Sequence, residues 1–306
     1  MSNPLVSVVV NCYNGEDYLD HCLNSIFSQT YQNWEVIFWD NASTDNSFKI
    51  FNSYNDKRLK YYKSKENVSL GQARAWAVEK CSGKFISFLD VDDQWFNDKT
   101  EIQLNQMLRD NSVLSYSSIV ETYPNSSKEK KVNVYHNSQD NFRQNLIQFE
   151  IQMPTIMILK SALDKKKLNF DPNVTASEEY CLCMQLIYKE RVSVIEKPLA
   201  KYLVRKNSLT NKNSKFWASE RLYTLDKLMS NHPEIKDLFF EEFKEASARA
   251  KYYEARHLMF IKDKISAIEK MSIIKFYSLR YFLLYLIILL PNYFWNKIHL
   301  IKSGRG

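Results

Sequence analysis

The first hundred residues alternate short apolar runs with segments of helical periodicity. Residues 5–10 (LVSVVV), 34–39 (WEVIFW) and 85–89 (FISFL) are continuous β-branched or aromatic runs, a pattern typical of strands buried on both faces of a parallel sheet. Residues 70–80 form one of the helical segments between them, and Gly83 ends it with a residue that tolerates a positive φ. Repeated strand–helix–strand units predict an α/β fold with a mostly parallel sheet flanked by helices.

The pattern changes along the rest of the chain. Residues 177–189 have the pattern of a helix that begins with acids, and residues 192–195 and 199–204 that of two strands. Beyond these strands the periodicity is mostly helical. The change predicts a first domain over residues 1–210 and a helical C-terminal region over residues 211–306.

The C-terminal region contains the most apolar stretch of the chain, residues 281–290 (YFLLYLIILL). A membrane-spanning helix needs about 20 apolar residues, so this run is too short to span, and Pro291 interrupts it. Aromatic side chains beside flanking cations favour the headgroup layer of a bilayer. We therefore expect residues 276–302 to associate with a membrane surface. The alternatives are a core helix or a helix that packs on a partner protein.

Composition narrows the class of protein further. The chain has 306 residues, 45% of them hydrophobic, with 42 Lys and Arg against 35 Asp and Glu, so it is too apolar and too nearly neutral for a disordered protein. Five Gly and seven Pro exclude a collagen-like chain. Ten Lys and Arg against three Asp and Glu fall in residues 251–306, so the remainder is close to neutral. This asymmetry excludes a uniformly basic nucleic-acid binder and points to a membrane surface.

Cysteine usage and the N-terminus bear on the compartment. The five cysteines are odd in number and match neither a disulfide framework nor a zinc-binding spacing. No charged-then-apolar leader precedes residues 5–10, so no signal peptide is expected. These observations predict a reduced protein on the cytosolic side.

Polar clusters follow three of the predicted strands, at residues 11–14, 40–45 and 90–93. In an open parallel sheet, ligands bind outside the carboxyl ends of the strands. Strand topology would gather the three clusters along one edge, although they are far apart in sequence. The sequence therefore predicts a ligand site at that edge.

The sharpest of these clusters is DVDD, with carboxylates at Asp90, Asp92 and Asp93. Three carboxylates this close repel one another unless a cation or solvent intervenes. Hard oxygen ligands suit Mg²⁺ or Mn²⁺, which also bind substrate phosphates. The alternative is an acidic turn that caps the following helix.

Two further residues have both a functional and a structural interpretation. Asp40 ends the second strand, where its carboxylate could accept a hydrogen bond from a base ring or form an N-cap or Asx turn. Arg74 lies on the predicted helix over residues 70–80. It could contact a nucleotide, pair with Asp40, or be an ordinary surface arginine.

Together these positions resemble the family 2 glycosyltransferases with the GT-A fold. The resemblance lies in four segments, in this order: PLVSVVVNCYNGEDYLDHCLNSI, QTYQNWEVIFWDNASTD, NVSLGQARAWAVEKCSGKFISFLDVDDQW and SEEYCLCMQLI. It is strong over about residues 4–110, moderate over 150–210 and absent beyond. It implies a GT-A fold and an inverting transfer from a nucleotide-diphosphate sugar with Mn²⁺ or Mg²⁺ as cofactor.

The resemblance also implies roles at the donor. Asp40 matches the family's base-recognising aspartate and Arg74 its nucleotide-side arginine. A histidine that is frequent near the end of the catalytic domain is absent, which leaves Arg205 as a diphosphate partner. The residues assigned to the nucleotide sugar are Asn11, Tyr13, Asp40, Arg74, Asp90 and Arg205.

The same resemblance implies metal-binding and catalytic roles. Asp90 and Asp92 match the family's DxD pair, Asp90 near the ribose and the metal and Asp92 on the metal. Asp93 is expected toward the donor sugar or the acceptor. Glu178 and Glu179 stand where the family usually has Glu-Asp, the second acid being the general base. Glu179 is therefore favoured as the base, with Glu178 as the alternative.

The function implied is an inverting hexosyltransferase that moves a sugar, from a UDP-sugar, to a hydroxyl of a glycan or lipid-linked saccharide in bacterial cell-surface polysaccharide biosynthesis. It would act at the cytoplasmic face of the membrane as a peripheral or monotopic protein, with no nucleic-acid partner. Two alternatives are a catalytically inactive GT-A scaffold and a nucleotidyltransferase. The latter usually has a Gly-rich, cationic phosphate loop after the first strand, and NCYNGED has no cation there.

Overall fold

The computed structural model describes residues 3–124, 126–135, 140–205 and 213–302. The chain divides into two compact units, Met1–Ser208 and Leu209–Gly306. The domain boundary predicted at residue 210 lies outside the described residues. Each unit contains a hydrophobic cluster of its own.

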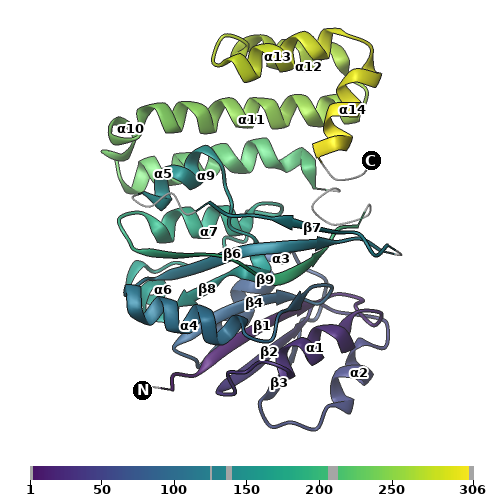
Figure 1. Cartoon of the computed structure of the whole chain (residues 1–306), viewed down its shortest axis with the longest axis vertical. Coiled ribbons are helices and arrows are strands. Elements are labelled where there is room, and N and C mark those ends of the chain that lie inside the picture. The colour runs from purple at the N-terminus through teal and green to yellow at the C-terminus, as the bar shows by residue number, and fades with distance from the viewer. Residues whose placement is uncertain (1–2, 125, 136–139, 206–212, 303–306) are drawn as a thin grey trace. The chain divides into compact units, whose positions relative to one another are not determined.

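The first unit is built on one nine-stranded sheet. Its strands are β1 (Val6–Cys12), β2 (Trp34–Asp40), β3 (Leu59–Lys63), β4 (Phe85–Asp90), β5 (Gln94–Trp95), β6 (Leu114–Thr122), β7 (Glu129–Val132), β8 (Met157–Leu159) and β9 (Val192–Leu203). They lie in the order β3-β2-β1-β4-β8-β6-β9-β5, with β7 paired to β6 (Figure 1). The α/β fold predicted from the sequence is present.

The parallel half of the sheet brings the polar strand ends together. β1 lies between β2 and β4 and is parallel to both, and β3 continues this arrangement beside β2. Asn11 of β1 is in register with Trp39 of β2 and with Asp90 of β4. The three predicted polar clusters therefore leave adjacent strands at one edge of the sheet.

The other half of the sheet is mixed, whereas the sequence predicted a mostly parallel one. β8 is antiparallel to β4 and β6, and β9 is parallel to β6 but antiparallel to β5. The two strands predicted over residues 192–204 are one strand, β9. Its register against β6 shifts between Ile195, which pairs with Ser117, and Pro198, which pairs with Ser118. Proline has no N–H for the ladder, which explains a bulge at this point.

Helices cover both faces of the sheet. They are α1 (Leu19–Phe27), α2 (Ser47–Ser53), α3 (Leu70–Glu79), α4 (Lys99–Asp110), α5 (Asn141–Ile147), α6 (Lys160–Lys166) and α7 (Glu178–Ile187). Alternate side chains of β1, such as Val8 and Val10, pack with α1, α2 and α4 in one hydrophobic cluster. On the opposite face, Trp76 of α3 packs against Trp39, with ring centroids 5.6 Å apart.

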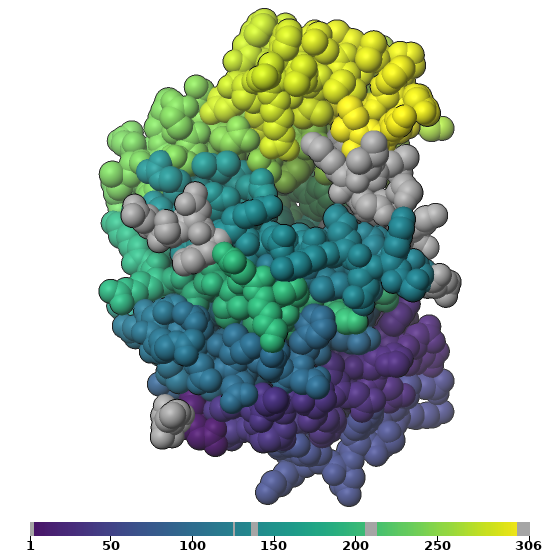
Figure 2. Space-filling view, in the orientation of Figure 1, coloured from purple at the N-terminus to yellow at the C-terminus, as the bar shows by residue number. Residues whose placement is uncertain are grey.

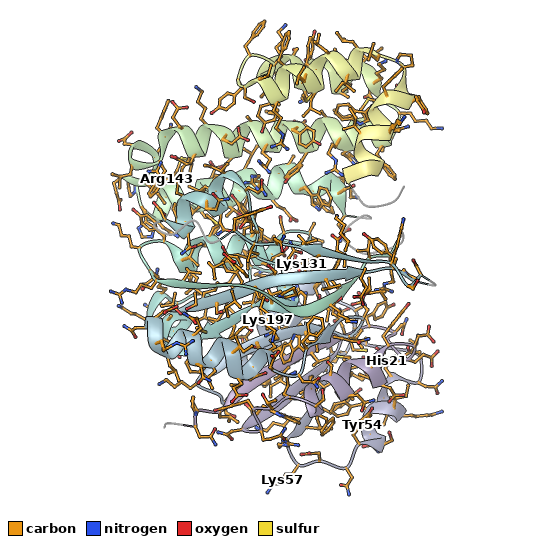
Figure 3. All side chains as sticks on the ribbon, in the orientation of Figure 1. His21, Tyr54, Lys57, Lys131, Arg143 and Lys197 are labelled. Atoms are coloured by element: carbon orange, nitrogen blue, oxygen red, sulfur yellow. The ribbon has the colours of Figure 1, made fainter. Side chains whose placement is uncertain are left out.

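Side chains at the margin of the sheet fix the outer helices (Figure 3). Tyr54, which follows α2, donates its hydroxyl to Asp20 Oδ1 of α1 at 2.8 Å and stacks on Phe27 at 5.5 Å between ring centroids. Lys57 is exposed, and Lys197, also exposed, pairs with Asp98 (Figure 3). The contacts of Tyr54 with Asp20 and Phe27 align α1 with α2 beside the loops of the predicted site.

All five cysteines are buried thiols. Burial raises the pKa of Cys12 to about 11 and that of Cys81 to about 12. A thiol with so high a pKa is protonated at neutral pH and is a poor nucleophile. The cysteines therefore act as small core side chains.

The second unit is helical. Its helices are α9 (Trp217–Asn231), α10 (Ile235–Leu238), α11 (Phe240–Phe260), α12 (Lys264–Ile274), α13 (Leu279–Leu289) and α14 (Asn292–Lys302). Helices α11, α12, α13 and α14 lie together (Figure 1). They share a buried cluster of side chains such as Tyr252, Met271, Tyr281 and Trp295. Part of the predicted apolar run is thus a core face. Among the described residues, no helix has the length and apolarity needed to cross a membrane.

Gly83, between α3 and β4, occupies a place with no room for a side chain. A Cβ added there would lie 2.6 Å from the backbone nitrogen of Ser7 and 2.8 Å from the carbonyl oxygen of Leu5. The φ of Gly83 lies outside the left-handed region, so its tolerance of a positive φ is not used here. The sequence requires glycine here because β1 passes so close.

We expect Gly83→Ala to lower the free energy of unfolding by about 1–3 kcal/mol, because the backbone of β1 must shift to admit a methyl group. Urea denaturation followed by circular dichroism measures this change. The control, Asn52→Ala at an exposed position of α2, should change stability by no more than about 0.5 kcal/mol. A Gly83→Ala variant as stable as the wild type would contradict the steric explanation.

Candidate active site

The carboxyl edge of the parallel strands carries a cluster of charged side chains. β4 ends at Asp90, and the loop that follows contains Asp92 and Asp93. Arg74 reaches Asp90 from α3 and also contacts Glu178 of α7. The structure thus brings together predicted site residues from elements that are up to about a hundred residues apart in sequence.

Arg74 joins this cluster. It is only 2% exposed, and its Nη2 donates to both carboxylate oxygens of Asp90, at 2.7 and 2.8 Å. Its Nη1 donates to Glu178. Because a buried charge is stable only when it is paired, the three side chains hold one another in position. The pairing of Arg74 with Asp40, one of the options from the sequence, is wrong, and its contact with a nucleotide stays a prediction.

Glu178 and Glu179 lie in the first turn of α7, where the helix dipole favours acidic side chains. Glu178 is buried, 4% exposed, and pairs with Arg74, whereas Glu179 is half-buried. Burial and the charge of Glu178 raise the pKa of Glu179 to about 8, against the opposing effect of Arg74. The neighbours therefore differ chemically, because only Glu179 combines solvent access with a high proton affinity.

Asp92 forms an ion pair with Arg205, which follows β9. The guanidinium of Arg205 also lies over the ring of Tyr18, 5.0 Å from its centroid. Burial and the charge of Asp90 raise the pKa of Asp92, although Arg205 opposes the shift. Arg205 therefore neutralises the carboxylate that was predicted to bind metal.

Asp93 is the most enclosed of the three aspartates, with 1% of its surface exposed. Its Oδ1 accepts the backbone N–H of Leu203 in β9 at 3.0 Å, and its Oδ2 has no hydrogen-bond partner in the described part of the chain. Burial and the charges of Asp92 and Asp90 raise its pKa well above the ordinary value. Asp93 is therefore buried against β9. Its predicted place beside the donor sugar or the acceptor stays a prediction.

The carboxylates suit a hard divalent cation. The side chains of Asp90 and Asp92 are 28% and 19% exposed, and the raised pKa of Asp92 reflects a repulsion that a cation would relieve. Within the described residues, no three or more His, Cys, Asp or Glu side chains form a ready-made metal cage. Mg²⁺ is usually held by one or two carboxylates together with substrate phosphates. Asp92, with Asp90 beside it, fits an ion of this kind.

Asn11 and Tyr13 flank the start of the loop after β1. Tyr13 is 50% exposed, so its ring is accessible to a ligand. Asn11 is 7% exposed, and its Nδ2 has no hydrogen-bond partner among the described residues. Both lie at the predicted edge of the sheet, and their contacts with a nucleotide stay predictions.

Asp40 is occupied by contacts within the protein. It is fully buried, its Oδ1 accepts the backbone N–H of Ser43 at 2.7 Å, and its Oδ2 accepts the hydroxyl of Tyr61 at 2.5 Å. The Nζ of Lys63 lies 3.5 Å from the same Oδ2. The bond from Ser43, three residues further on, is a capping-type contact within the turn after β2, in line with the structural alternative. The geometry favours that role, and the base contact predicted for Asp40 stays a prediction.

Sequence reasoning missed the partners of these acids. Tyr61 and Lys63 reach Asp40 from β3, and Tyr18 lies against Arg205. The parallel pairing of β2 with β3, which aligns Asp40 with Lys63, is the signal that could have identified the first two. Nothing in the sequence connects Tyr18 with Arg205.

Comparison with known proteins agrees with this geometry. The sequence matches the family described as "Glycosyl transferase family 2" over residues 7–166. An uncharacterized glycosyltransferase of Haemophilus influenzae is 32% identical over 224 residues, which are 71% of this chain and 85% of the relative. The Escherichia coli UDP-Glc:alpha-D-GlcNAc-diphosphoundecaprenol beta-1,3-glucosyltransferase WfgD is 29% identical over 219 residues, 70% of this chain and 83% of WfgD.

The fold also matches solved structures. The mannosyltransferase PcManGT from Pyrobaculum calidifontis, solved with GDP-Man and Mn²⁺, superposes with a TM-score of 0.60 at 17% identity, over 99% of this chain and 87% of PcManGT. By contrast, the chain spans only 30%, 32% and 33% of the length of three Rickettsia glycosyltransferases.

A mixed sheet of this order, with a carboxylate cluster at the end of its central parallel strands, is the GT-A fold of glycosyltransferases, so the predicted fold is confirmed. The chain belongs to glycosyl transferase family 2. It is therefore a glycosyltransferase, and the alternative of a nucleotidyltransferase is excluded.

The variant Asp40→Asn tests the structural role of this aspartate. We expect its free energy of unfolding to fall by about 1.5–3 kcal/mol in urea denaturation, because the charge-assisted contacts with Tyr61 and Lys63 are lost. Tyr61→Phe removes one contact from the other side, and the double variant should cost less than the sum of the two. Unchanged stability with weaker binding of UDP in calorimetry would instead support the base contact.

Proposed function

We propose that this chain transfers a sugar, with inversion, from a UDP-sugar to a hydroxyl of a lipid-linked saccharide or glycan in the assembly of a bacterial cell-surface polysaccharide. The observation that carries the proposal is the pair of unlike carboxylates at the start of α7. Glu178 is fixed by Arg74, while Glu179 is accessible and has a pKa raised to about 8. An inverting transfer needs one such base and no covalent intermediate.

In the proposed reaction Glu179 takes the proton of the acceptor hydroxyl while the oxygen of that hydroxyl attacks the anomeric carbon of the donor sugar. The bond between that carbon and the diphosphate oxygen breaks, and its electron pair leaves with the diphosphate. Glu178 does not compete for the proton, because its charge is engaged with Arg74. Asp90, held by the same arginine, keeps the end of β4 in register with the base.

The departing diphosphate requires positive charge. Asp92 and Asp90 would hold a divalent cation, Mn²⁺ or Mg²⁺, which would stabilise the charge of the leaving group. Because Asp92 already pairs with Arg205, metal binding there competes with that ion pair. The guanidinium of Arg205 lies beside this carboxylate, and its planar donors would suit the diphosphate of the donor.

Relatives support the donor and acceptor classes. The name of WfgD states a UDP-Glc donor, a diphosphoundecaprenol-linked acceptor and a β-1,3 product, and PcManGT was solved with GDP-Man and Mn²⁺. Here the side chains best placed to receive the nucleotide are the exposed ring of Tyr13 and the amide of Asn11, whose Nδ2 has no partner among the described residues.

A lipid-linked acceptor implies work at a membrane. We propose that the enzyme acts at the cytoplasmic face as a peripheral or monotopic protein, with residues 276–302 on the bilayer. This location confines the enzyme and its acceptor to one surface. The exposed apolar side chains of α13 and its neighbours support it.

The central test is a panel of UDP-, GDP- and dTDP-sugars assayed for Mn²⁺-dependent binding and slow hydrolysis. We expect a UDP-sugar to be preferred and EDTA to abolish turnover, because the leaving diphosphate loses its stabilising charge. Binding without turnover of any donor would favour the inactive scaffold.

Replacing the base separates the two glutamates. Glu179→Gln should reduce turnover by about 10²–10⁴-fold while leaving donor affinity unchanged. Glu178→Gln should instead lower thermal stability, because it leaves the buried Arg74 short of one carboxylate. If only Glu178→Gln loses turnover in a stably folded enzyme, the base is Glu178.

The same assignment predicts the pH dependence. The base must be unprotonated, so kcat/KM should rise with pH up to about 8 and then level off. The folded state binds the Glu179 proton more tightly than the unfolded state, so this group costs stability as pH rises from about 4.5 to about 8. Glu179→Gln should therefore melt higher than the wild type at pH 8.5 but not at pH 4.5 in scanning calorimetry.

Asp92→Asn tests the metal. We expect it to fold normally, to weaken Mn²⁺ binding measured by electron paramagnetic resonance, and to lower turnover by about 100-fold or more. Asp98→Asn, at the start of α4 and paired with Lys197, is the matched control and should leave both unchanged. Full activity of Asp92→Asn would remove Asp92 from the metal site.

A further inference from the structure

The second unit exposes an apolar surface that the proposed chemistry does not use. Within residues 260–294, thirteen large apolar side chains are at least 36% exposed, whereas the rest of the described chain contributes seven. We refer to these thirteen as the apolar face. They are Phe260, Ile261, Ile265, Ile273, Phe276, Leu279, Phe282, Leu283, Leu286, Leu289, Leu290, Tyr293 and Phe294.

The centre of the apolar face is the outer side of α13. The inner side of this helix is buried through Tyr281, Leu284 and Ile288. The outer side carries Leu279, Leu283, Leu286 and Leu290, spaced four, three and four residues apart, so they form one stripe opposite the buried side. The stripe contains no charged residue, which is unusual for the solvent-exposed side of a helix in a soluble protein.

Neighbouring elements extend this stripe at both ends. At the start of α13, Phe276 of the preceding turn stacks on Phe282, with ring centroids 6.4 Å apart. At its end, Lys264 of α12 donates to the carbonyl oxygens of Leu289 and Leu290, at 3.3 and 2.7 Å. That contact brings the start of α12, with the exposed Ile265, against the end of α13. Figure 2 shows these helices in yellow at the surface of the second unit.

Cations surround the apolar face. Residues 260–302 contain seven Lys and Arg against two Asp and Glu. Lys275 lies 5.0 Å from the ring centroids of both Phe276 and Tyr285, and Lys297 lies 5.8 Å from that of Tyr293. One of the two acids, Asp263, caps α12 by accepting from the backbone N–H of Ser266 at 3.1 Å. Ammonium groups above aromatic rings at the edge of an apolar surface are typical of a membrane interface.

We infer that the apolar face lies in the boundary between headgroups and acyl chains of an anionic bilayer, with α13 parallel to the membrane plane. An 11-residue helix is about 16 Å long, roughly half the hydrocarbon thickness, so it suits this orientation and not a spanning one. The face is wider than residues 276–302, because the turn between α11 and α12 belongs to it. The role of the apolar face rests on the proposed function, since the face would hold the enzyme beside a lipid-linked acceptor.

The charge pattern argues against a second copy of the chain as the occupant. In a symmetric dimer the same surface meets itself, so Lys275, Arg280 and Lys297 of both copies would approach one another. Anionic headgroups instead neutralise these cations, and each cation near such a surface strengthens binding by about fivefold. The apolar face and its charged margin therefore fit one partner, the anionic lipid surface.

Vesicle co-sedimentation of the full chain tests this inference. We expect binding to phosphatidylcholine vesicles containing about one third phosphatidylglycerol, weaker binding to pure phosphatidylcholine, and weakening by salt. The double variant Leu283→Gln/Leu286→Gln should bind at least tenfold less, because it replaces the middle of the stripe. Lys275→Gln should bind about fivefold less. The matched control, Phe48→Gln/Leu108→Gln, replaces exposed apolar residues of the first unit and should bind as the wild type does.

The altered apolar side chains are exposed and Lys275 is half-buried, so all variants should keep the wild-type melting temperature, which calorimetry checks. A stripe variant that sediments with vesicles as well as the wild type overturns the inference, as does a wild type that ignores anionic vesicles. So does a wild-type dimer in light scattering that the stripe variant converts to a monomer, because a second copy then covers the face.

Nucleotide-sugar hydrolysis without vesicles tests the proposed function separately. A chain that hydrolyses a donor but ignores vesicles loses only the membrane inference. A chain that binds vesicles but no nucleotide sugar loses only the proposed reaction.

Discussion

A buried arginine between two carboxylates is the interaction on which the site depends. Arg74 is nearly inaccessible to solvent and joins the end of β4, through Asp90, to the start of α7, through Glu178. Removing either acid would leave part of the buried guanidinium without its carboxylate partner, a costly outcome. The ion pairs therefore fix the distance between the carboxyl edge of the parallel strands and the helix that carries Glu179. They also make two adjacent glutamates different, because Glu178 is held in an ion pair whereas Glu179 has a raised pKa.

The parallel half of the fold could be predicted from the sequence, and the mixed half could not. Residues 5–10, 34–39 and 85–89 are apolar runs separated by segments of helical periodicity. This local pattern is enough to predict adjacent parallel strands. β8 has only three residues, and β5 has two, too few for any periodicity. β9 was divided in two because Pro198 interrupts its pattern, whereas the sheet continues past it as a bulge.

The candidate site divides in the same way. The cluster of Asp90, Asp92 and Asp93 was visible because three acids directly follow an apolar strand. Their partners were not visible, because Arg74 and Arg205 reach them from far along the chain. Asp40 shows the limit of a motif, since a carboxylate at a strand end serves a ligand or the protein's own turn equally well. Only the hydrogen bonds from Ser43 and Tyr61 distinguish the two roles.

The buried thiols of this chain have a practical consequence. All five cysteines are shielded from solvent, and the raised pKa values of Cys12 and Cys81 keep those sulfurs protonated at neutral pH. Alkylating reagents act on exposed thiolates, so the native protein offers them almost no target. A single cysteine introduced on the surface would then carry a fluorescent label alone, with the natural cysteines left in place. The folded chain is in effect already prepared for site-specific spectroscopy.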